Sequence, residues 1–492
     1  MAVTLCNMRA VSGQVIPLFF TFKRCFFTAT APRFGHSECM RADKSEEISR
    51  PTLAIYGLMG APLALVGYPI AIWLPAFYAS HVGVSLAGVA TMLLLAKLSD
   101  VVTDPVIGMI SDRLRTPWGR RRPLILLGTP VLVASIWFLF VPPEGVGEWY
   151  LLLCIAGMYI GTSLVGLPYG AWGAEISPDY VQRARVTAWR EQFTLIGLLL
   201  AAFIPFLVEQ YGDGSIESIM RSMALAIGLA APISAILLSV FVRETPPENA
   251  QSKDEMPFTE GLARIWRNRP MRIVIGLILI VTLAEAFRNA LSLFFMRVVI
   301  QASDVGTLYF GYFAAGLLAV PFWLWLGRKL GKHIAFAFTL ITVAIISAVN
   351  MAFDQDDYTV FVIFFLAKGA CFGGLQFLPL AILADVIDVE TAETGKARAG
   401  SYIAISSMTA KISTALGTFL AIRALSLTEF DAKILSDNSF DDLFALRVLY
   451  TLIPAAFFIG AIILAILFPL NAKAHGELRQ RISARRDGVS DS

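Results

Sequence analysis

Three ionisable side chains lie within one apolar stretch of this sequence, at a spacing that places them on the same side of a helix. Lys97, Asp100 and Asp104 occur in KLSDVVTDPVIG, and at 3.6 residues per turn they share one narrow face. Carboxylates one turn apart repel each other, and burial disfavours their charged forms. Such a pair is stable only with a bound cation, a shared proton or a basic partner. These residues therefore indicate either a cation site or a static salt-bridge cluster.

A second lysine can complete this group from a distant part of the chain. Lys411 lies in SYIAISSMTAKISTALG, which is otherwise apolar and rich in small residues. A helix that faced the first one across a central cavity would place Lys411 beside Asp104, in a charge network with Lys97. Ionisable side chains at membrane depth are costly and mark ion or substrate pathways. We therefore favour an ion site whose charge changes with occupancy, and the static cluster stays open as an alternative.

The elements that hold these residues are apolar helices. Of the 492 residues, 57% are hydrophobic and 16% are charged, whereas soluble chains carry about 25% charged residues. Apolar runs long enough to cross a hydrocarbon core recur along most of the chain. The sequence therefore predicts an all-α membrane protein with twelve transmembrane helices: 53–80, 85–110, 123–142, 149–173, 188–210, 222–242, 272–298, 305–327, 334–353, 359–384, 400–423 and 447–470.

Basic residues concentrate in alternate loops between these spans. Loop 111–122 contains five arginines, and the segment 473–486 is also basic, whereas the intervening loops are acidic or neutral. The excess of Lys and Arg in short loops marks the cytoplasmic side. We therefore expect a multi-pass protein of an inner or plasma membrane, with both ends of the mature chain in the cytoplasm.

The longest polar interruption between spans divides them six and six. Each half also has a short basic loop after its second span. This weak duplication is typical of carriers built from two six-helix bundles. The predicted parts are an N-terminal bundle (49–242), a cytoplasmic linker (243–271), a C-terminal bundle (272–470) and a cytoplasmic tail (471–492).

Residues 1–48 differ in composition from the rest, because they mix Arg, Cys and Phe around a single short apolar run, VIPLFFTF. Such a segment is either a targeting peptide or lies upstream of a true start at Met40. Both interpretations stay open. Either one would remove all or most of the extension from the mature protein, and we assign it no function.

Neither a resident cofactor nor a catalytic centre is indicated by the sequence. The five cysteines show no CxxC or Cys/His ligand spacing, so no metal site or disulfide framework is supported. No nucleophile–base–metal set occurs, and histidine is scarce, with four residues. We therefore expect no enzyme, no cofactor, no metal beyond a transported Na⁺ and no nucleic-acid partner. The expected partners are a small solute, a coupling cation and the bilayer, and we expect a monomer.

The segment after the second span combines glycines, one acid and a fan of guanidinium groups. The first glycine would allow close helix approach, the acid would cap or pair locally, and the arginines would clamp helix ends in one conformation. The segment is therefore either a conformational latch or a loop that only sets topology. The residues of this predicted latch are Gly108, Asp112, Arg113, Gly119, Arg120, Arg121 and Arg122.

Other residues suggest contacts with a solute. The planar fork of Arg190 can donate two hydrogen bonds to hydroxyls or a carboxylate, although a snorkelling role at the membrane edge is equally consistent with its position. Glu285 and Arg288, three residues apart, are expected to neutralise one another near the membrane edge. Four aromatic residues could line a solute path, although packing is the more common role: Tyr68, Trp73, Tyr169 and Trp172.

The motifs around these residues resemble those of the glycoside–pentoside–hexuronide:cation symporter family, the melibiose-carrier group of the major facilitator superfamily. The resemblance covers roughly 51–470 and rests on DVVTDPVIGMISDRLRTPWGRRRP, PYGAWGAEISPDYVQRARV and ILADVIDVE. It implies the major facilitator fold and symport of a sugar, glycoside or related small organic solute with Na⁺ or H⁺ by alternating access.

The resemblance also assigns roles to individual positions. Asp100 and Asp104 match the two acids that bind the coupling cation, and Ser163 is similar to a threonine that completes the site. Thr103 stands where the melibiose carrier has an asparagine, and Arg190 matches a sugar-binding arginine. Lys97 and Lys411 are similar to basic residues near the family's cavity.

Two positions depart from the family pattern. Ala64 and Gly166 stand where the melibiose carrier has carboxylates that bind galactosyl hydroxyls, and neither residue has a side chain that accepts a hydrogen bond. The solute is therefore expected to be a different glycoside, a uronide or a less polar compound. The alternatives are a uniporter or lipid-type carrier without ion coupling on the same fold and, remotely, a membrane sensor or intramembrane enzyme.

Overall fold

The computed structural model describes residues 47–177, 179–244, 268–394, 399–432 and 438–468. Within these ranges the chain forms helices and one isolated bridge, between Thr116 and Gly119, and it forms no strand. The predicted extension 1–48 and linker 243–271 fall mainly outside the described residues, and the predicted tail 471–492 falls wholly outside them.

Among the described residues, twelve helical segments are long and apolar enough to span a membrane, which confirms the all-α prediction. The N-terminal six consist of α1 (Arg50–Leu58) with α2 (Gly60–Ile72), α4 (Leu86–Arg113), α5 (Arg122–Phe140), α6 (Glu148–Glu175), α7 (Tyr180–Tyr211) and α8 (Ile216–Phe241). The C-terminal six are α10 (Arg269–Phe294), α11 (Val305–Leu330), α12 (Lys332–Val349), α13 (Tyr358–Thr394), α14 (Ala399–Leu425) and α15 (Phe440–Ile466).

Several helices are longer than the apolar spans predicted from the sequence. Helix α7 begins at Tyr180, not near residue 188, because the Asp179 side chain accepts a hydrogen bond from the Val181 N–H and caps the polar first turns. Helix α15 likewise begins at Phe440, capped by Ser439, rather than near residue 447. Capped polar turns extend a helix beyond the apolar core of the span.

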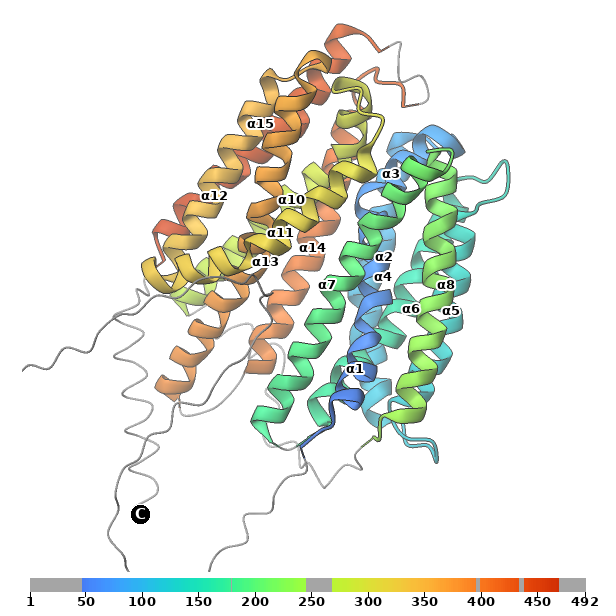
Figure 1. Ribbon diagram of the computed structural model, residues 1–492, viewed down its shortest axis with the longest axis vertical. Helices are drawn as coiled ribbons and strands as arrows, with labels where there is room; N and C mark the ends of the chain where they lie inside the picture. The colour runs from blue at the N-terminus through green and yellow to red at the C-terminus, as the bar shows by residue number, and fades with distance from the viewer. Residues whose placement is uncertain (1–46, 178, 245–267, 395–398, 433–437, 469–492) are drawn as a thin grey trace, which may run out of the picture. The chain divides into compact units, whose positions relative to one another are not determined.

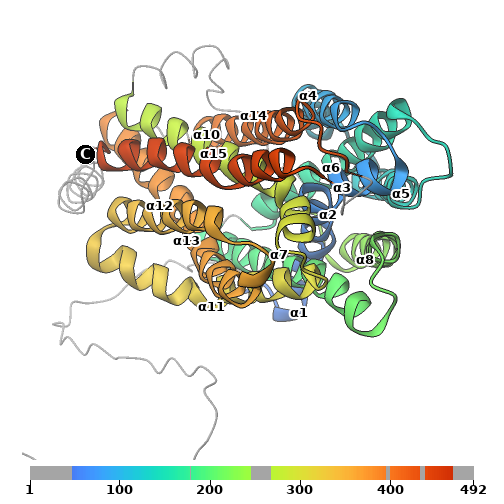
Figure 2. The same ribbon diagram turned by 90° about the horizontal axis from the view of Figure 1, so that it is seen from above.

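The helices form two six-helix bundles, α1–α8 and α10–α15, which lie on opposite sides of the molecule in Figures 1 and 2. The bundles meet mainly along three helix pairs: α4 with α14, α7 with α11, and α2 with α10. Short elements complete the ends of the helices: α3 (Leu74–Ala76), η1 (Phe77–Val82), η2 (Phe295–Val299), η3 (Asn350–Ala352) and η4 (Gln355–Asp357).

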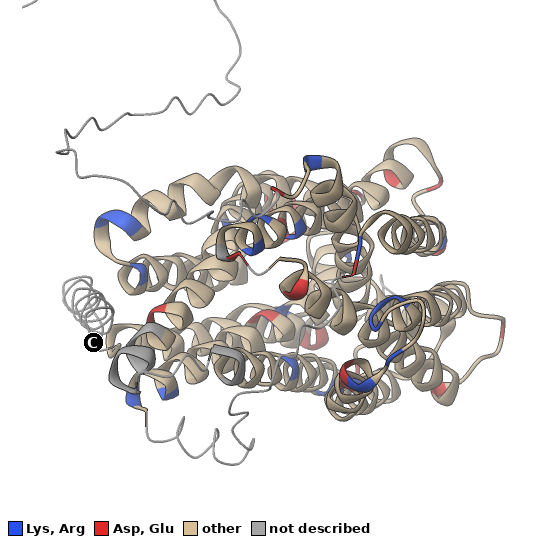
Figure 3. Ribbon diagram, turned by 90° about the horizontal axis from the view of Figure 1, so that it is seen from below, with Lys and Arg blue, Asp and Glu red and all other residues tan. Residues whose placement is uncertain are grey.

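The charged loops distinguish the two ends of the bundles. Loop 114–121 and the start of α12 belong to one end, here called the basic end, and Figure 3 shows Lys and Arg segments in both bundles when the molecule is viewed from that side. The opposite end, here called the acidic end, carries Glu209, Asp213 and Asp304 at the tips of α7, α8 and α11.

Small residues set the distance between helices within a bundle. A Cβ atom added at Gly161 of α6 would lie 2.6 Å from the backbone nitrogen of Leu132 on α5, so glycine is required for this approach. A Cβ added at Gly166, five residues along the same helix, would meet no atom within 4 Å. Close backbone contact at small residues is the usual source of helix association in membranes.

We expect Gly161→Ala to destabilise the protein, because the new methyl group forces α5 and α6 apart. Overpacking of this kind typically costs about 1–3 kcal/mol. Gly166→Ala is the matched control and should keep or raise stability, by up to about 1 kcal/mol from helix propensity. Thermal unfolding of the purified protein in detergent measures both, and equal unfolding temperatures for the two variants would contradict the packing.

Candidate functional site

The packing of α4 against α14 brings the two predicted carboxylates to a lysine of the other bundle. Lys411 Nζ lies 3.0 Å from Asp100 Oδ2 and also contacts Asp104 Oδ2. Lys97 Nζ, one turn before Asp100 on α4, lies 3.1 Å from the same Asp100 oxygen. The structure thus assembles the predicted charge network from α4 and α14, and its function stays a prediction.

Ser163 of α6 lies between the two carboxylates. Its Oγ atom is 3.1 Å from Asp100 Oδ1 and 2.6 Å from Asp104 Oδ1. A hydroxyl group donates one hydrogen at a time, so Ser163 can donate a hydrogen bond to only one of the two carboxylates. The lone pairs of its oxygen remain beside both of them. Thr103, also a predicted cation ligand, instead donates its hydroxyl to the Asp100 carbonyl oxygen at 3.3 Å. The structure does not bring Thr103 into the carboxylate group.

The four charges of this cluster balance, with two carboxylates against two ammonium groups. The Asp100 side chain is 3% exposed and that of Asp104 is 20% exposed. Lys97 Nζ also lies 4.0 Å from the centre of the Tyr159 ring, a cation–π contact that sequence reasoning missed. In this conformation the lysines supply the positive charge that the paired carboxylates require.

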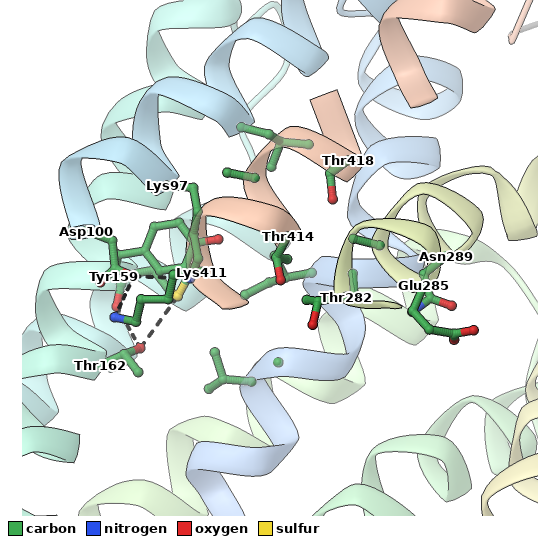
Figure 4. Close-up of a pocket in the computed structure, with 18 of the residues that line it drawn as sticks. Lys97, Asp100, Tyr159, Thr162, Thr282, Glu285, Asn289, Lys411, Thr414 and Thr418 are labelled. Carbon is green, nitrogen blue, oxygen red and sulfur yellow. Dashed lines mark hydrogen bonds and ion pairs between the residues drawn. The ribbon is translucent and has the colours of Figure 1, made fainter. Parts of the chain in front are cut away.

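A cavity of about 460 Å³ reaches the cluster from the space between the bundles. Figure 4 shows Lys97, Asp100 and Lys411 on one side of it and Glu285 with Asn289 on the other. Threonines from α10 and α14 lie between the two groups. The polar residues lining the cavity are Lys97, Asp100, Tyr159, Thr162, Ser163, Thr282, Glu285, Asn289, Gln376, Lys411, Thr414 and Thr418.

The wall formed by the C-terminal bundle holds a second buried charge cluster. Glu285 lies 3.2 Å from Arg288 and 3.2 Å from Lys368, whose side chains are 2% and 1% exposed. The expected Glu285–Arg288 pair therefore exists, but it faces the cavity instead of the membrane edge, because α10 continues well beyond both residues. Lys368 lies in the middle of an apolar span, the same signal that identified Lys411.

None of the five predicted solute-binding side chains lines this cavity. Arg190 instead pairs with its neighbour Glu191, 2.8 Å away. Tyr169 donates its hydroxyl to the Tyr56 carbonyl oxygen at 2.9 Å, and Trp172 donates to the Arg243 carbonyl oxygen at 3.4 Å. These three contacts hold the side chains inside the N-terminal bundle.

The other two predicted solute contacts, Tyr68 and Trp73, are buried on the acidic side of the cavity. The Tyr68 ring packs edge-on against Tyr309 and Phe313 of α11, while Trp73 is fully buried beneath the guanidinium of Arg297. These aromatic residues therefore form a seal between the bundles rather than the wall of a solute path. Packing, the more common role of membrane aromatics, accounts for their positions.

The arginine-rich loop is fastened to its own bundle. Arg121, 2% exposed, donates to Glu175 Oε1 at 2.6 Å and to Asp112 Oδ1 at 2.8 Å. Although burial alone would lower the pKa of Arg121, its hydrogen bonds to Glu175 and Asp112 raise it above its ordinary value. The buried guanidinium therefore stays charged and clamps the end of α4 to the end of α6. Arg120 lies near the same two acids, at 3.8 and 3.9 Å.

Glu244 is a further member of this loop cluster that the sequence did not reveal. Its Oε1 atom accepts hydrogen bonds from the backbone N–H groups of Arg120 and Arg121, at 2.7 and 2.8 Å. Gly119, at φ +117°, leaves the space that the Glu244 carboxylate fills. Arg122 reaches the carbonyl oxygen of Val242 at 2.8 Å, so the loop is tied to the end of α8 as well as α6.

Two residues of the predicted latch take no part in this clamp. A Cβ at Gly108 would meet no atom within 4 Å, so the expected close helix approach at Gly108 is wrong for this conformation. The Arg113 side chain is exposed. The described partners of the remaining latch residues lie in the N-terminal bundle or directly after α8, and their role as a conformational latch stays a prediction.

At the acidic end the two bundles are joined directly. The Glu209 carboxylate of α7 accepts hydrogen bonds from the N–H groups of Gly306 and Thr307 at the first turn of α11, at 2.8 and 3.1 Å. Helix N-termini favour negative charge because their N–H groups are unpaired. A Cβ at Gly306 would lie 2.6 Å from Pro205, so α7 and α11 touch through their backbones. The contact closes the space between the bundles toward the acidic end.

Comparisons with known proteins agree with this architecture. A family model described as MFS/sugar transport protein matches residues 55–472. The chain belongs to this family. With relatives that are named symporters, the match places it in the glycoside–pentoside–hexuronide symporter group of the major facilitator superfamily. It is therefore an integral multi-pass membrane transporter rather than an enzyme.

Several curated relatives align along nearly the whole chain. The isoprimeverose transporter of Lactiplantibacillus pentosus is 25% identical, covering 86% of this chain and 89% of its own length. The sodium-dependent lysophosphatidylcholine symporter 1 of Mus musculus is 23% identical over 91% of each chain. An inner membrane symporter of Escherichia coli is 24% identical, over 86% of this chain and 92% of its own.

Solved structures confirm the predicted fold. The nucleoside transporter NupG superposes with a TM-score of 0.60 at 12% identity, covering 85% of this chain and 98% of its own. A bacterial homologue of the human lysosomal transporter Spinster gives 0.59 at 14% identity, over 86% and 98% of the two chains. At this identity the likeness concerns the fold alone.

We expect Glu209→Ala to open the acidic end of the cavity, because it removes both hydrogen bonds to α11. Hydrogen bonds to a charged group contribute roughly 1.5–3 kcal/mol, which corresponds to about tenfold or more in the open population. Thr418→Cys, placed in the cavity of a variant whose native cysteines are replaced by serine, reports the opening by its reaction with an impermeant thiol reagent added on the acidic side.

Glu217→Ala provides the control for this measurement, because Glu217 lies at the same end in the first turn of α8, with its side chain 62% exposed. The control should label at the parent rate. If Glu209→Ala also labelled at the parent rate, the capping contact would have no part in closing the acidic end.

Proposed function

We propose that this protein moves a small organic solute across the membrane together with a cation, Na⁺ or H⁺, by alternating access. The observation that carries the proposal is the ion pair of Lys411 with Asp100 and Asp104. It joins α14 of one bundle to α4 of the other and borders the cavity. Its strength therefore depends on the relative position of the two bundles.

The chemistry of the cluster suggests how a cation is coupled to the solute. A sodium ion or proton at the two carboxylates would take over the charge that Lys411 supplies in this conformation. Sodium, as a hard cation, would also use the neutral oxygen of Ser163, 2.6 Å from Asp104, since such ions prefer oxygen ligands. Displacement of Lys411 would release the bond between bundles and change the wall of the cavity. A cation that favours one conformation in this way also favours any solute that binds to it.

The names of the relatives support this proposal. Among them are a sodium-dependent symporter and a transporter named for the sugar isoprimeverose. The orientation is also part of the proposal: the arginines of loop 111–122 favour a cytoplasmic location for the basic end. Both ends of the chain would then lie in the cytoplasm of an inner or plasma membrane, and this conformation would be the inward-facing one of a monomeric carrier.

Domain boundaries follow from the same proposal. The bundles within 49–242 and 272–470 would rock as two bodies about the cavity. Segment 243–271 would connect them on the cytoplasmic side, and residues 471–492 would form a cytoplasmic tail.

One observation favours a second candidate, a uniporter or lipid-type carrier without ion coupling. The four charges of the cluster already balance in this conformation, so the carboxylates need no further cation. On this alternative, the Lys411 contacts would only stabilise one conformation. The two candidates differ in a measurable way, because a uniporter would show no specific response to sodium or to a proton gradient.

Cation binding can be tested without knowledge of the solute. We expect NaCl, compared with choline chloride at equal ionic strength and at two pH values, to stabilise the purified protein against heat. A ligand at a hundred times its Kd stabilises by about 2.7 kcal/mol. Asp104→Asn should abolish the response to sodium or pH, whereas Glu144→Gln, a change in an exposed loop, should keep it.

Lys411→Gln separates the two candidates most sharply. If the ammonium group competes with the cation, its removal should lower the Kd for sodium by about tenfold or more, since a competing ion pair of about 1.4 kcal/mol corresponds to a factor of ten. Uptake of labelled methyl glycosides into proteoliposomes, with and without an imposed sodium or proton gradient, gives the second measurement. A wild-type protein indifferent to sodium, to pH and to both gradients would favour the uniporter.

A further inference from the structure

A second cavity adjoins the first and has a different character. It measures about 560 Å³ and lies between α10, α13 and α14, in the halves of these helices nearest the basic end. Its lining is mainly apolar, including Ile278, Leu375, Pro379, Leu383 and Ile403, with two serines from α14. Here the first space is called the polar chamber and the second the apolar chamber.

Three residues line both chambers: Thr282, Glu285 and Gln376. They mark the junction where a bound molecule would pass from polar to apolar surroundings. The Gln376 side chain is exposed to this space, and the Thr282 side chain is partly exposed. A hydroxyl, a carboxylate and an amide at one junction offer both donors and acceptors, the set that complements the hydroxyl groups of a solute.

The Glu285 carboxylate is held in place as an acceptor. Arg288 and Lys368 approach it at 3.2 Å from behind, and both are almost fully buried. Two basic side chains thus fix the position of one carboxylate, which also lines both chambers. A hydrogen bond to an ionised acceptor is about twice as strong as a neutral one.

The N-terminal bundle offers no comparable acceptor at the two positions singled out in the sequence. Ala64 has no polar side-chain atom, and a Cβ at Gly166 would meet no neighbour within 4 Å. The carboxylates that this bundle does contribute, Asp100 and Asp104, are engaged by lysines. A carboxylate not engaged by these lysines therefore occurs on the opposite wall, at Glu285.

We propose, on the basis of the transport function proposed above, that the solute is an amphiphile bound across the two chambers. Its hydroxyl-bearing head, such as a sugar ring, hydrogen-bonds to Glu285, Thr282 and Gln376 at the junction. Its apolar part, an alkyl or aryl substituent, occupies the apolar chamber between α10, α13 and α14. The apolar chamber then selects for the substituent and the junction selects for the head.

The first test compares methyl and hexyl glycosides of the same sugars, below the concentration at which the hexyl compounds form micelles. Each buried methylene group contributes roughly fourfold in affinity. The hexyl compound should therefore bind at least about tenfold more tightly, measured by thermal shift of the purified protein. Ala384→Phe fills the apolar chamber, which Ala384 lines, and should remove this preference while methyl glycosides still bind.

Ala367→Phe is the matched control, because Ala367 is an exposed residue of the same helix that lines neither chamber. It should keep the preference for the hexyl compound. Equal affinities for methyl and hexyl glycosides in the wild type, or a hexyl preference that survives Ala384→Phe, would overturn the assignment of the apolar chamber.

The second test concerns the junction. Thr282→Val and Gln376→Ala should each weaken methyl and hexyl glycosides equally, by about threefold to tenfold for a lost neutral hydrogen bond. Glu285→Gln should weaken the binding of methyl and hexyl glycosides more than either of these variants does. This change leaves the buried Arg288 and Lys368 without their acidic partner. If Glu285→Gln fails to fold for that reason, Thr282→Val and Gln376→Ala still test the junction. Thr342→Val, a change on the outer face of α12, is the control and should alter neither affinity.

The outcome for cations separates this inference from the proposed function. A protein that responds to sodium or pH but binds methyl and hexyl glycosides alike, or ignores the junction variants, refutes the amphiphile and leaves symport intact. A protein that prefers hexyl glycosides through Ala384 but shows no cation response refutes coupling and leaves the solute site standing. A protein that showed neither a cation response nor a preference for hexyl glycosides would refute both the coupling and the amphiphile site.

Discussion

Two carboxylates on one face of α4, buried between helices, cannot both stay ionised without positive charge beside them. Asp100 and Asp104 obtain that charge from Lys97 on their own helix and from Lys411 on α14. Lys411 belongs to the other bundle. The ion pairs that neutralise the carboxylates of α4 therefore also join the two bundles. The burial of the pair thus links the charge on α4 to the relative position of the two halves of the protein.

The two ends of the molecule are held in different ways. At the acidic end Glu209 of α7 caps the start of α11, and the ring of Tyr68 packs against that of Tyr309. These contacts join the two bundles at this end. At the basic end Arg121 pairs with Glu175 inside its own bundle. The N-terminal bundle is therefore stiffened near the basic loops, while the contact that closes the space between bundles lies at the far end. Such an arrangement suits motion of two stiff bodies about a central cavity.

The walls of that cavity differ in what they offer a ligand. The N-terminal wall presents carboxylates that are already paired with lysines, and the C-terminal wall presents Glu285 fixed by Arg288 and Lys368. Each of these buried charges lies beside a group of opposite charge, and removal of such a partner would leave an uncompensated buried charge. The division separates a set of groups suited to a cation from a set suited to hydroxyl groups, in one space that both ligands would share.

The sequence by itself determined the twelve spans, the basic and acidic ends and the common face of Lys97, Asp100 and Asp104, because hydropathy and helical periodicity are local properties. It also indicated that Lys411 needed a partner. Only the tertiary structure decided that Thr103 stays outside the carboxylate group and that Lys368 and Glu244 belong to charge clusters. It also decided that Tyr68 and Trp73 seal the bundles instead of lining the cavity. The physical reason is that contacts between helices depend on how each helix is rotated and packed, and those quantities are set by the whole assembly of helices rather than by any one segment.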